Sequence, residues 1–161
     1  MDYTAPQAGH VVMMCGVAGS GKTTYAQKLE ARGYTRLSVD EEIWQRFGRY
    51  GVDYDPSAYA GLQEEAKKHL WDRFLGLLGV RQPVVLDYSF WQRATRDHFK
   101  SVIEEYGCHW SLVYLKVDPQ VIRQRLAIRS ERFDANAAFT ITDEILSSYL
   151  NGFEEPVGEG E

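Results

Sequence analysis

The chain has 161 residues, of which 44% are hydrophobic and 25% are charged, and its formal net charge is −5. This length and composition predict one globular domain and exclude a disordered or fibrous protein. The negative charge argues against a protein that gains affinity by tracking many nucleic-acid phosphates, because that mode of binding needs a basic surface.

The apolar runs are a few residues long, far below the roughly 20 that a membrane helix needs. The N-terminus has an acidic residue at position 2 and does not resemble a signal peptide, so we expect a cytoplasmic protein. Cys15 and Cys108 lie in apolar segments and are expected to be buried packing residues. We expect an N-terminal tail at 1–9, one domain at 10–153 and a mobile acidic tail at 154–161.

Apolar runs and capping residues divide the domain into alternating strands and helices. In chain order we expect a strand at 10–15, a helix at 22–32, a strand at 34–39, a short helix at 41–47, a loop at 48–56, a helix at 57–79, a strand at 83–87, a helix at 93–106, a strand at 110–117, a helix at 119–129 and a last helix begun by Thr142. This alternation predicts an α/β fold with a parallel sheet covered by helices on both faces.

Residues 16–23 read GVAGSGKT and match the phosphate-binding pattern GxxxxGK[ST]. They stand between a predicted strand and a predicted helix, which is the context that this motif requires. Such a loop points backbone N–H groups at a phosphate, and Lys22 adds a positive charge beside the β- and γ-phosphates. The motif predicts ATP binding by Gly16, Ala18, Gly19, Ser20, Gly21, Lys22, Thr23 and Thr24, with the Thr23 hydroxyl on Mg²⁺. The alternative is a glycine-rich turn that binds nothing.

Two aspartates stand at the ends of predicted strands, Asp40 after 34–39 and Asp87 at the end of 83–87. Ligands of open parallel sheets bind at the carboxyl ends of the strands, so both carboxylates should face the γ-phosphate. We expect Asp87 to hold Mg²⁺, directly or through water, and Asp40 to accept a proton from the attacking hydroxyl. The alternatives are that Asp40 only caps the helix at 41–47 and that Asp87 is a satisfied loop acid.

Arginines gather in the helix at 119–129 and in the polar segment after it. Arg125 and Arg129 are four residues apart and share one helix face, so both guanidinium groups can approach one nucleotide. A lid that brings arginines onto the phosphates would supply charge and exclude water. The alternative is a solvated helix face whose arginines pair with glutamates.

A second group of aromatic and basic residues follows the strand at 83–87. Trp91, Arg93 and Arg96 could form a pocket for the phosphoryl acceptor, with Arg46 opposite. The alternative, which weighs equally, is that the aromatic residues here belong to the core.

The ordered set of motifs GVAGSGKTT, LSVD, VVLDYSFWQRATR, VYLKVDPQVIRQRLAIR, FTIT and FEEP resembles P-loop kinases of the zeta-toxin, chloramphenicol phosphotransferase and bacterial polynucleotide kinase type. The resemblance covers about residues 10–156. It implies a three-layer P-loop NTPase fold with an arginine-bearing lid, Asp40 as the catalytic base, Arg125 near the adenine and Arg129 on the phosphates. Such proteins often carry one more strand after the FEEP segment, so the sheet should have four or five strands.

These features favour an ATP- and Mg²⁺-dependent kinase that acts on the hydroxyl of a nucleoside, sugar or antibiotic. A kinase of 5′-hydroxyl polynucleotide ends is disfavoured by the negative charge, although a local arginine groove would permit it. A third alternative is a switch that binds or hydrolyses ATP and has no acceptor. The sequence does not fix the acceptor, the preference for ATP over GTP, or the oligomeric state.

Overall fold

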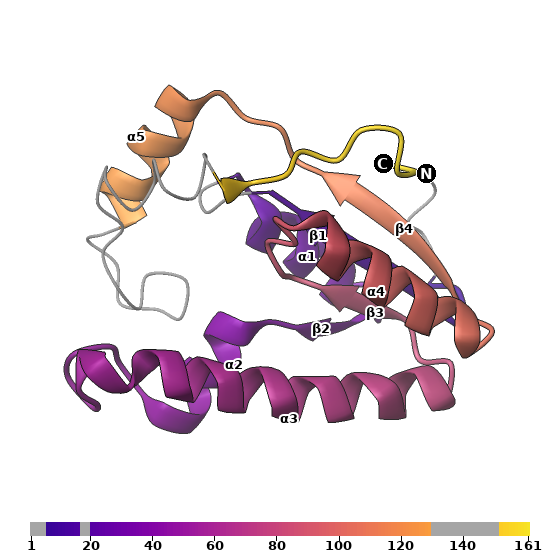
Figure 1. The fold of residues 1–161 in the computed structure, drawn as a ribbon, viewed down its shortest axis with the longest axis horizontal. Helices are drawn as coiled ribbons and strands as arrows, with labels where there is room; N and C mark the ends of the chain where they lie inside the picture. Colours follow the sequence, from indigo (N-terminus) through magenta and orange to yellow (C-terminus); the bar gives the residue numbers. More distant parts are fainter. Residues whose placement is uncertain (1–5, 17–19, 130–151) are drawn as a thin grey trace.

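A parallel sheet of four strands lies at the centre of the described molecule (Figure 1). The computed structural model describes residues 6–16, 20–129 and 152–161. The strands lie in the order β2-β3-β1-β4, which places β3 beside β1 as is usual for this architecture. Their bounds are β1 His10–Cys15, β2 Thr35–Leu37, β3 Val84–Leu86 and β4 His109–Tyr114.

Helices connect successive strands, as the sequence predicts. The bounds are α1 Lys22–Glu30, α2 Val39–Phe47, α3 Tyr59–Gly79, α4 Arg93–Glu105 and α5 Pro119–Arg129, with a short 3₁₀ helix, η1, at Pro56–Ala58. In the described part of the chain, no helix is long and apolar enough to cross a membrane.

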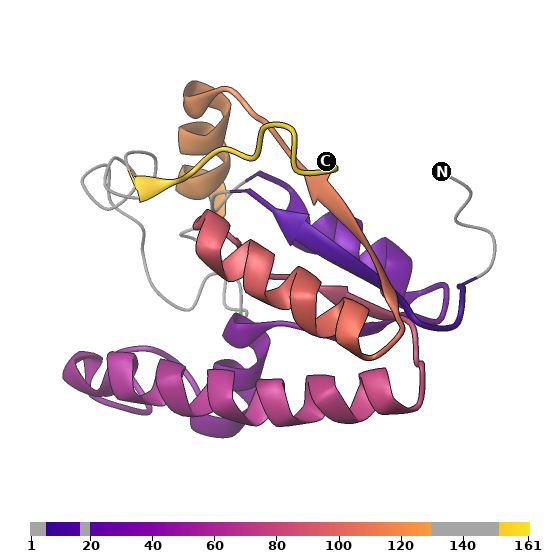
Figure 2. The ribbon, with the colours of Figure 1, turned by 45° about the vertical axis from the view of Figure 1, so that its right-hand side comes forward.

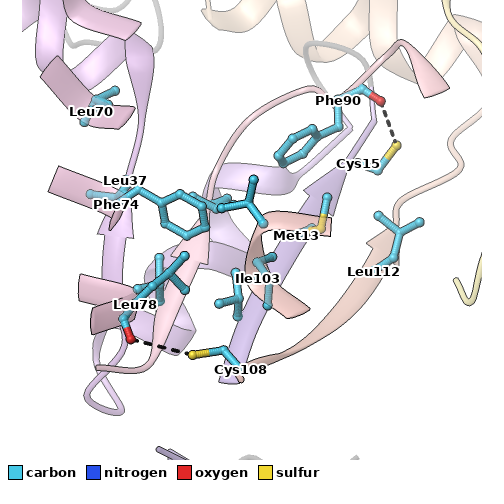
Figure 3. Packing of buried hydrophobic residues seen from close by; sticks show 14 residues of the cluster. Met13, Cys15, Leu37, Leu70, Phe74, Leu78, Phe90, Ile103, Cys108 and Leu112 are labelled. Atoms are coloured by element: carbon cyan, nitrogen blue, oxygen red, sulfur yellow. Dashed lines mark hydrogen bonds between the residues drawn. The ribbon is translucent and has the colours of Figure 1, made fainter. Parts of the chain in front are cut away.

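The two faces of the sheet are covered by different helices. On one face, Phe74 and Leu78 of α3 and Ile103 of α4 converge on Met13 of β1 (Figure 3). On the other face, α1 contributes Ala26 and Leu29 to a second cluster, which includes Val12, Met14 and Val85 of the strands. All six residues of β1 are buried, because this inner strand is covered on both faces.

The predicted α/β fold is confirmed, and two local predictions are corrected. β2 ends at Leu37, two residues earlier than expected, because α2 begins sooner than the sequence suggested. The N-cap of α2 is Ser38, whose Oγ accepts a hydrogen bond of 3.2 Å from the backbone N–H of Glu41. Asp40 therefore lies in the first turn of the helix and is not its cap. The helix expected from Thr142 lies outside the described residues.

The last residues of the chain lie beside β4 in both views (Figures 1 and 2), which corrects the expectation of a mobile acidic tail. The ring of Phe153 stacks on that of Tyr114 with 5.7 Å between centroids. Further on, Glu159 is buried and its carboxylate forms an ion pair with Arg96 of α4. We call residues 153–161 the C-terminal strap.

Candidate active site

The predicted phosphate-binding turn joins β1 to α1, although residues 17–19 lie outside the described chain. Gly16 has a φ of 154°, and a Cβ added there would lie 2.7 Å from Oγ of Ser20, too close to be tolerated. Gly21 has a φ of 99° and forms the N-cap of α1 in the left-handed region. Both positions thus favour glycine, and the absence of a side chain at Gly21 leaves the N-terminus of α1 open to an anion.

The hydroxyl of Ser20 is buried and has no hydrogen-bonding partner among the described residues. A buried polar atom without a partner is costly, and such atoms usually mark a site where a ligand or water completes the bonding. Its place in the turn before α1 therefore suits an anion such as phosphate. The sequence motif had already assigned Ser20 to this site.

Asp87 directly follows β3 and lies beside the start of α1. Its Oδ2 accepts a hydrogen bond of 3.0 Å from the Thr23 hydroxyl. The same Oδ2 accepts bonds of 3.1 Å and 2.9 Å from Nε and Nη2 of Arg36 in β2. Strand order explains this meeting, because β3 lies between β1 and β2 and carries Asp87 into reach of both neighbours.

Sequence reasoning brought Thr23 and Asp87 to one place but missed Arg36. The sequence carries one signal for this residue, because Arg36 is a charged residue inside a predicted strand and stands directly before apolar Leu37. The side chains of Arg36 and Asp87 are only 7% and 3% exposed, so the pair is shielded from water. A buried charge of this kind requires a partner of opposite charge, and Arg36 and Asp87 are partners of each other.

Oxygen ligands and an open phosphate site fit Mg²⁺. Thr23 and Asp87 offer a hydroxyl and a carboxylate oxygen, which are the hard donors that this ion prefers. Among the described residues, no cluster of three or more His, Cys, Asp or Glu side chains could hold a metal. The site therefore fits a metal that completes its coordination with phosphate oxygens and water.

Asp40 is half-buried in the first turn of α2. Tyr50 and Tyr54 of the loop after that helix form an aromatic group with Tyr59 at the start of α3. The rings of Tyr50 and Tyr59 meet edge to face at 5.3 Å, and Tyr54 stacks on Tyr59 at 6.4 Å. The Tyr54 hydroxyl is buried without a hydrogen-bonding partner in the described structure. Burial raises the pKa of Tyr54, and the charges of Tyr50 and Asp40 raise it further. Tyr54 is thus within electrostatic reach of the candidate base, and sequence reasoning did not single it out.

The predicted nucleotide arginines belong to α5. The Cβ that Gly21 lacks would lie 3.8 Å from Nη1 of Arg125, so this guanidinium stands beside the phosphate-binding turn. Arg125 is exposed toward solvent. Arg129 is the last residue of α5, and its side chain lies outside the described part of the chain. The polar segment predicted to continue the lid also lies outside it.

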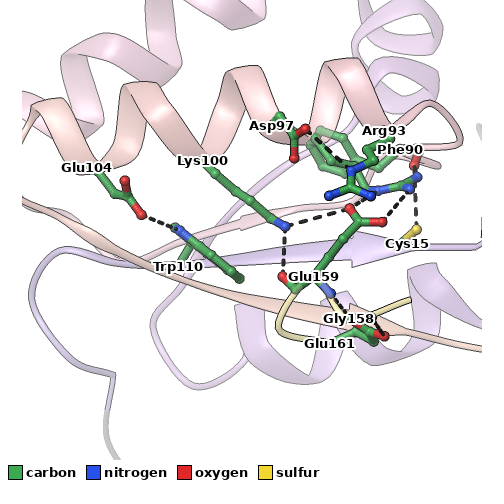
Figure 4. Close-up of polar contacts among 11 residues, drawn as sticks. Cys15, Phe90, Arg93, Asp97, Lys100, Glu104, Trp110, Gly158, Glu159 and Glu161 are labelled. Carbon is green, nitrogen blue, oxygen red and sulfur yellow. Dashed lines mark hydrogen bonds and ion pairs between the residues drawn. The ribbon is translucent and has the colours of Figure 1, made fainter. Parts of the chain in front are cut away.

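The predicted acceptor residues do not share one environment. Arg96 is wholly buried, and its Nε and Nη2 donate 2.9 Å hydrogen bonds to the two carboxylate oxygens of Glu159. Figure 4 labels Glu159 and shows the polar contacts around it. The prediction that Arg96 lines an acceptor pocket is therefore corrected, because its guanidinium belongs to the core. Arg93 is exposed and lies 3.6 Å from Asp97 on its own helix. Arg46 lies 3.6 Å from a carboxylate oxygen of Glu42 on α2.

Trp91 is partly exposed and bonded to the C-terminal strap. The residue is 38% exposed, and its backbone carbonyl accepts a hydrogen bond of 2.6 Å from the N–H of Glu154. A Cβ on Gly152, the residue just before the strap, would lie 2.6 Å from the indole ring, so the chain passes close to this tryptophan as it enters the strap. Both cysteines are buried, as predicted, and burial raises the pKa of the Cys15 thiol to about 11. Cys15 is therefore a packing residue and not a nucleophile.

Comparison with known proteins identifies the family of this chain. The AAA domain family matches residues 11–156, nearly the whole chain. A UPF0200 protein of Pyrobaculum aerophilum is 28% identical over 125 residues, which are 78% of this chain and 69% of that protein.

Solved structures share the fold at low sequence identity. A provisionally named kinase from Chloroflexus aurantiacus has a TM-score of 0.73 and 16% identity, covering 96% of this chain and 85% of that one. A gluconokinase from Sinorhizobium meliloti has a TM-score of 0.61 and 21% identity, covering 95% and 79%. Kti12 of Chaetomium thermophilum, solved with ADP-AlF3, has a TM-score of 0.63 and 16% identity, covering 91% and 81%. The narrower likeness to zeta toxins and chloramphenicol phosphotransferases stays a prediction. The match over residues 11–156 shows that this chain belongs to the AAA domain family.

Proposed function

We propose that this protein is a cytoplasmic, ATP-dependent kinase that transfers the γ-phosphoryl group to a hydroxyl of a small molecule. The observation that carries the proposal is the junction of Thr23 and Asp87, bonded at 3.0 Å at the start of the helix that follows the phosphate-binding turn. Asp40 lies in the first turn of α2, the helix that follows β2, and β2 is two strands away from β1 in the sheet. The site thus combines a phosphate cradle, a candidate metal position and a separate carboxylate at one edge of the sheet.

The turn and the N-terminus of α1 would hold the polyphosphate of ATP. Lys22 begins α1, so its ammonium group can reach the β- and γ-phosphates while backbone N–H groups bind the others. Thr23 and Asp87 would hold Mg²⁺, which when bound neutralises charge on the phosphates. The unpartnered Ser20 hydroxyl supports an anion at this position.

Asp40 would orient the acceptor hydroxyl and take up its proton. Its carboxylate lies in the first turn of α2, the helix that directly follows β2. The Tyr54 hydroxyl is buried within the field of Asp40 and could donate a hydrogen bond to the substrate hydroxyl that Asp40 orients. Arg125 beside Gly21, and Arg129 at the end of α5, would add positive charge over the phosphates.

A transfer assay tests the proposal directly. Purified protein with Mg²⁺ and [γ-³²P]ATP is offered nucleosides, sugars, sugar acids, antibiotics and 5′-hydroxyl oligonucleotides. Labelling of a small molecule supports the proposal, and labelling of oligonucleotides alone would move the acceptor class to polynucleotide ends. A slow ATPase that no acceptor accelerates would favour the switch and contradict the kinase.

A matched pair of variants tests the role of Asp40. Asp40→Asn should lower transfer by about 10²–10⁴-fold, because a positioned base contributes that much, while ATP binding stays close to that of the parent. Glu41→Gln is the control, since Glu41 is the next residue of α2 and its carboxylate accepts a bond from Gln45 at an exposed position. Equal turnover by Asp40→Asn and the parent would remove Asp40 from the mechanism.

A further inference from the structure

Arg36 forms an unusual pairing with the candidate metal carboxylate. Two of its N–H groups bond Oδ2 of Asp87, at 3.1 Å and 2.9 Å, and the Thr23 hydroxyl bonds the same oxygen at 3.0 Å. A carboxylate has about four acceptor positions shared between two oxygens, so three donors saturate Oδ2. Oδ2 is therefore closed to a cation while Arg36 remains in place, and a cation that approached the other oxygen, Oδ1, would still stand beside the positive guanidinium.

The charges at the site also oppose the binding of a bare metal ion to Asp87. The Arg36 side chain is 7% exposed, so its positive charge depends on Asp87 for compensation. A divalent ion that took Asp87 would remove this partner and would also stand close to a like charge in a site shielded from water. Binding of a bare metal ion is therefore opposed twice.

A nucleotide changes this balance. Its phosphates bring several negative charges to the N-terminus of α1, where Lys22 and Thr23 begin the helix. Phosphate oxygens would then offer Arg36 an alternative partner, because a guanidinium binds phosphate as well as carboxylate. Asp87 would be released or shared only when this alternative partner is present.

We propose that Arg36 is a positioning residue that occupies Asp87 in the nucleotide-free protein, so that the site rejects free Mg²⁺ and accepts the metal only together with a nucleotide. The inference rests on the proposed function in one respect, namely that Thr23 and Asp87 are the metal ligands. It assigns to β2 a residue that neither the phosphate-binding motif nor the candidate base includes.

Manganese binding to the nucleotide-free protein tests the proposal without any acceptor. Mn²⁺ is titrated against parent, Arg36→Met and the double variant Arg36→Met/Asp87→Asn, and free Mn²⁺ is measured by electron paramagnetic resonance. Arg36→Met should bind Mn²⁺ at least about tenfold more tightly than the parent, because the competing charge is removed from a shielded carboxylate. The double variant should lose this gain. Equal affinity of a folded Arg36→Met variant and the parent would overturn the proposal.

Two further measurements keep the test decisive should Arg36→Met fold poorly. Arg36→Lys keeps the positive charge and should bind Mn²⁺ within about twofold of the parent, because a like charge still opposes the ion; a tenfold gain there would contradict the inference. In the parent, the NMR signal of the Arg36 Nε–H should stay unchanged with Mg²⁺ alone and shift with Mg²⁺ and ADP. A shift with Mg²⁺ alone would also contradict it. Since the manganese titration contains no nucleotide, it can succeed or fail independently of phosphoryl transfer.

Discussion

The ion pair between Arg96 and Glu159 makes the stability of the domain depend on its last few residues. The two side chains are 0% and 2% exposed, and both guanidinium bonds are 2.9 Å long. Arg96 also donates a 2.6 Å bond to the backbone carbonyl of Phe90, and Lys100 donates a 2.8 Å bond to the backbone carbonyl of Glu159 (Figure 4). Glu159→Gln keeps the size of the side chain but leaves the buried guanidinium without its counter-ion.

Removing one partner of a buried ion pair typically costs about 3–5 kcal/mol. Glu159 belongs to the C-terminal strap, which could lift from the sheet and let water reach Arg96, so we expect a loss near the lower end, about 3 kcal/mol. For a domain of this size, each kcal/mol lowers Tm by about 2–4 °C, so the melting temperature should fall by about 6–12 °C. Differential scanning calorimetry and urea unfolding measure the two quantities.

A second glutamate of the strap supplies a matched control. Glu155 pairs with Lys116 at 3.0 Å, but these side chains are 45% and 76% exposed. Glu155→Gln should therefore cost less than about 1 kcal/mol. If Glu159→Gln were no more destabilising than Glu155→Gln, the buried pair would not stabilise the fold and the reasoning would be refuted.

The pH dependence of the same variant has a defined sign. Hydrogen bonds from Arg96 hold the pKa of Glu159 below its usual 4.5. A depressed carboxyl pKa contributes stability that is present above the unfolded value and is lost as the pH falls through the folded value. The difference in stability between parent and Glu159→Gln should thus be full above about pH 4.5 and shrink below it. A difference that grew in acid would contradict this assignment.

Three further predictions concern single side chains. Ser38→Ala removes the N-cap bond to Glu41 and should cost about 1 kcal/mol in urea unfolding, whereas an unchanged free energy would contradict the cap. Burial, and then the charge of His109, lower the pKa of His10 below 6.5, so the stability of the parent should fall as the pH drops below about 6.5. His10→Gln should flatten this fall, and parallel pH profiles of the two proteins would refute the assignment. Tyr54→Phe removes a buried hydroxyl without a partner and should raise stability by up to about 1 kcal/mol, so a marked loss would reveal a partner for this hydroxyl.

Local patterns in the sequence sufficed for most of the fold. The run at 11–15 is apolar throughout because β1 is buried on both faces, and Gly16 and Gly21 after it have the positive φ angles that glycine adopts readily. The bond between Thr23 and Asp87 was also within reach of prediction, since the ends of neighbouring parallel strands meet at one edge of a sheet. The N-cap of α2 was placed wrongly because Ser38 and Asp40 are both favourable capping residues and only geometry decides between them.

Pairings between distant residues could not be predicted in this way. Glu159 stands in a stretch rich in glutamate and glycine that is typical of a solvated tail, and its partner Arg96 lies 63 residues earlier. The same limit applies to Arg36, whose bond to Asp87 spans 51 residues. Both pairs follow from how strands and the strap lie side by side, and a buried charge is recognisable only after its surroundings are known.

Binding of Mg·ATP to the parent and to Lys22→Ala tests the central claim most directly. Isothermal titration calorimetry should show tight binding to the parent and at least about a tenfold weaker affinity for the variant, because the variant lacks the ammonium group that would lie beside the β- and γ-phosphates. Circular dichroism of the variant confirms that the fold persists. Equal affinity of the two proteins, or failure of the parent to bind Mg·ATP, would contradict the account.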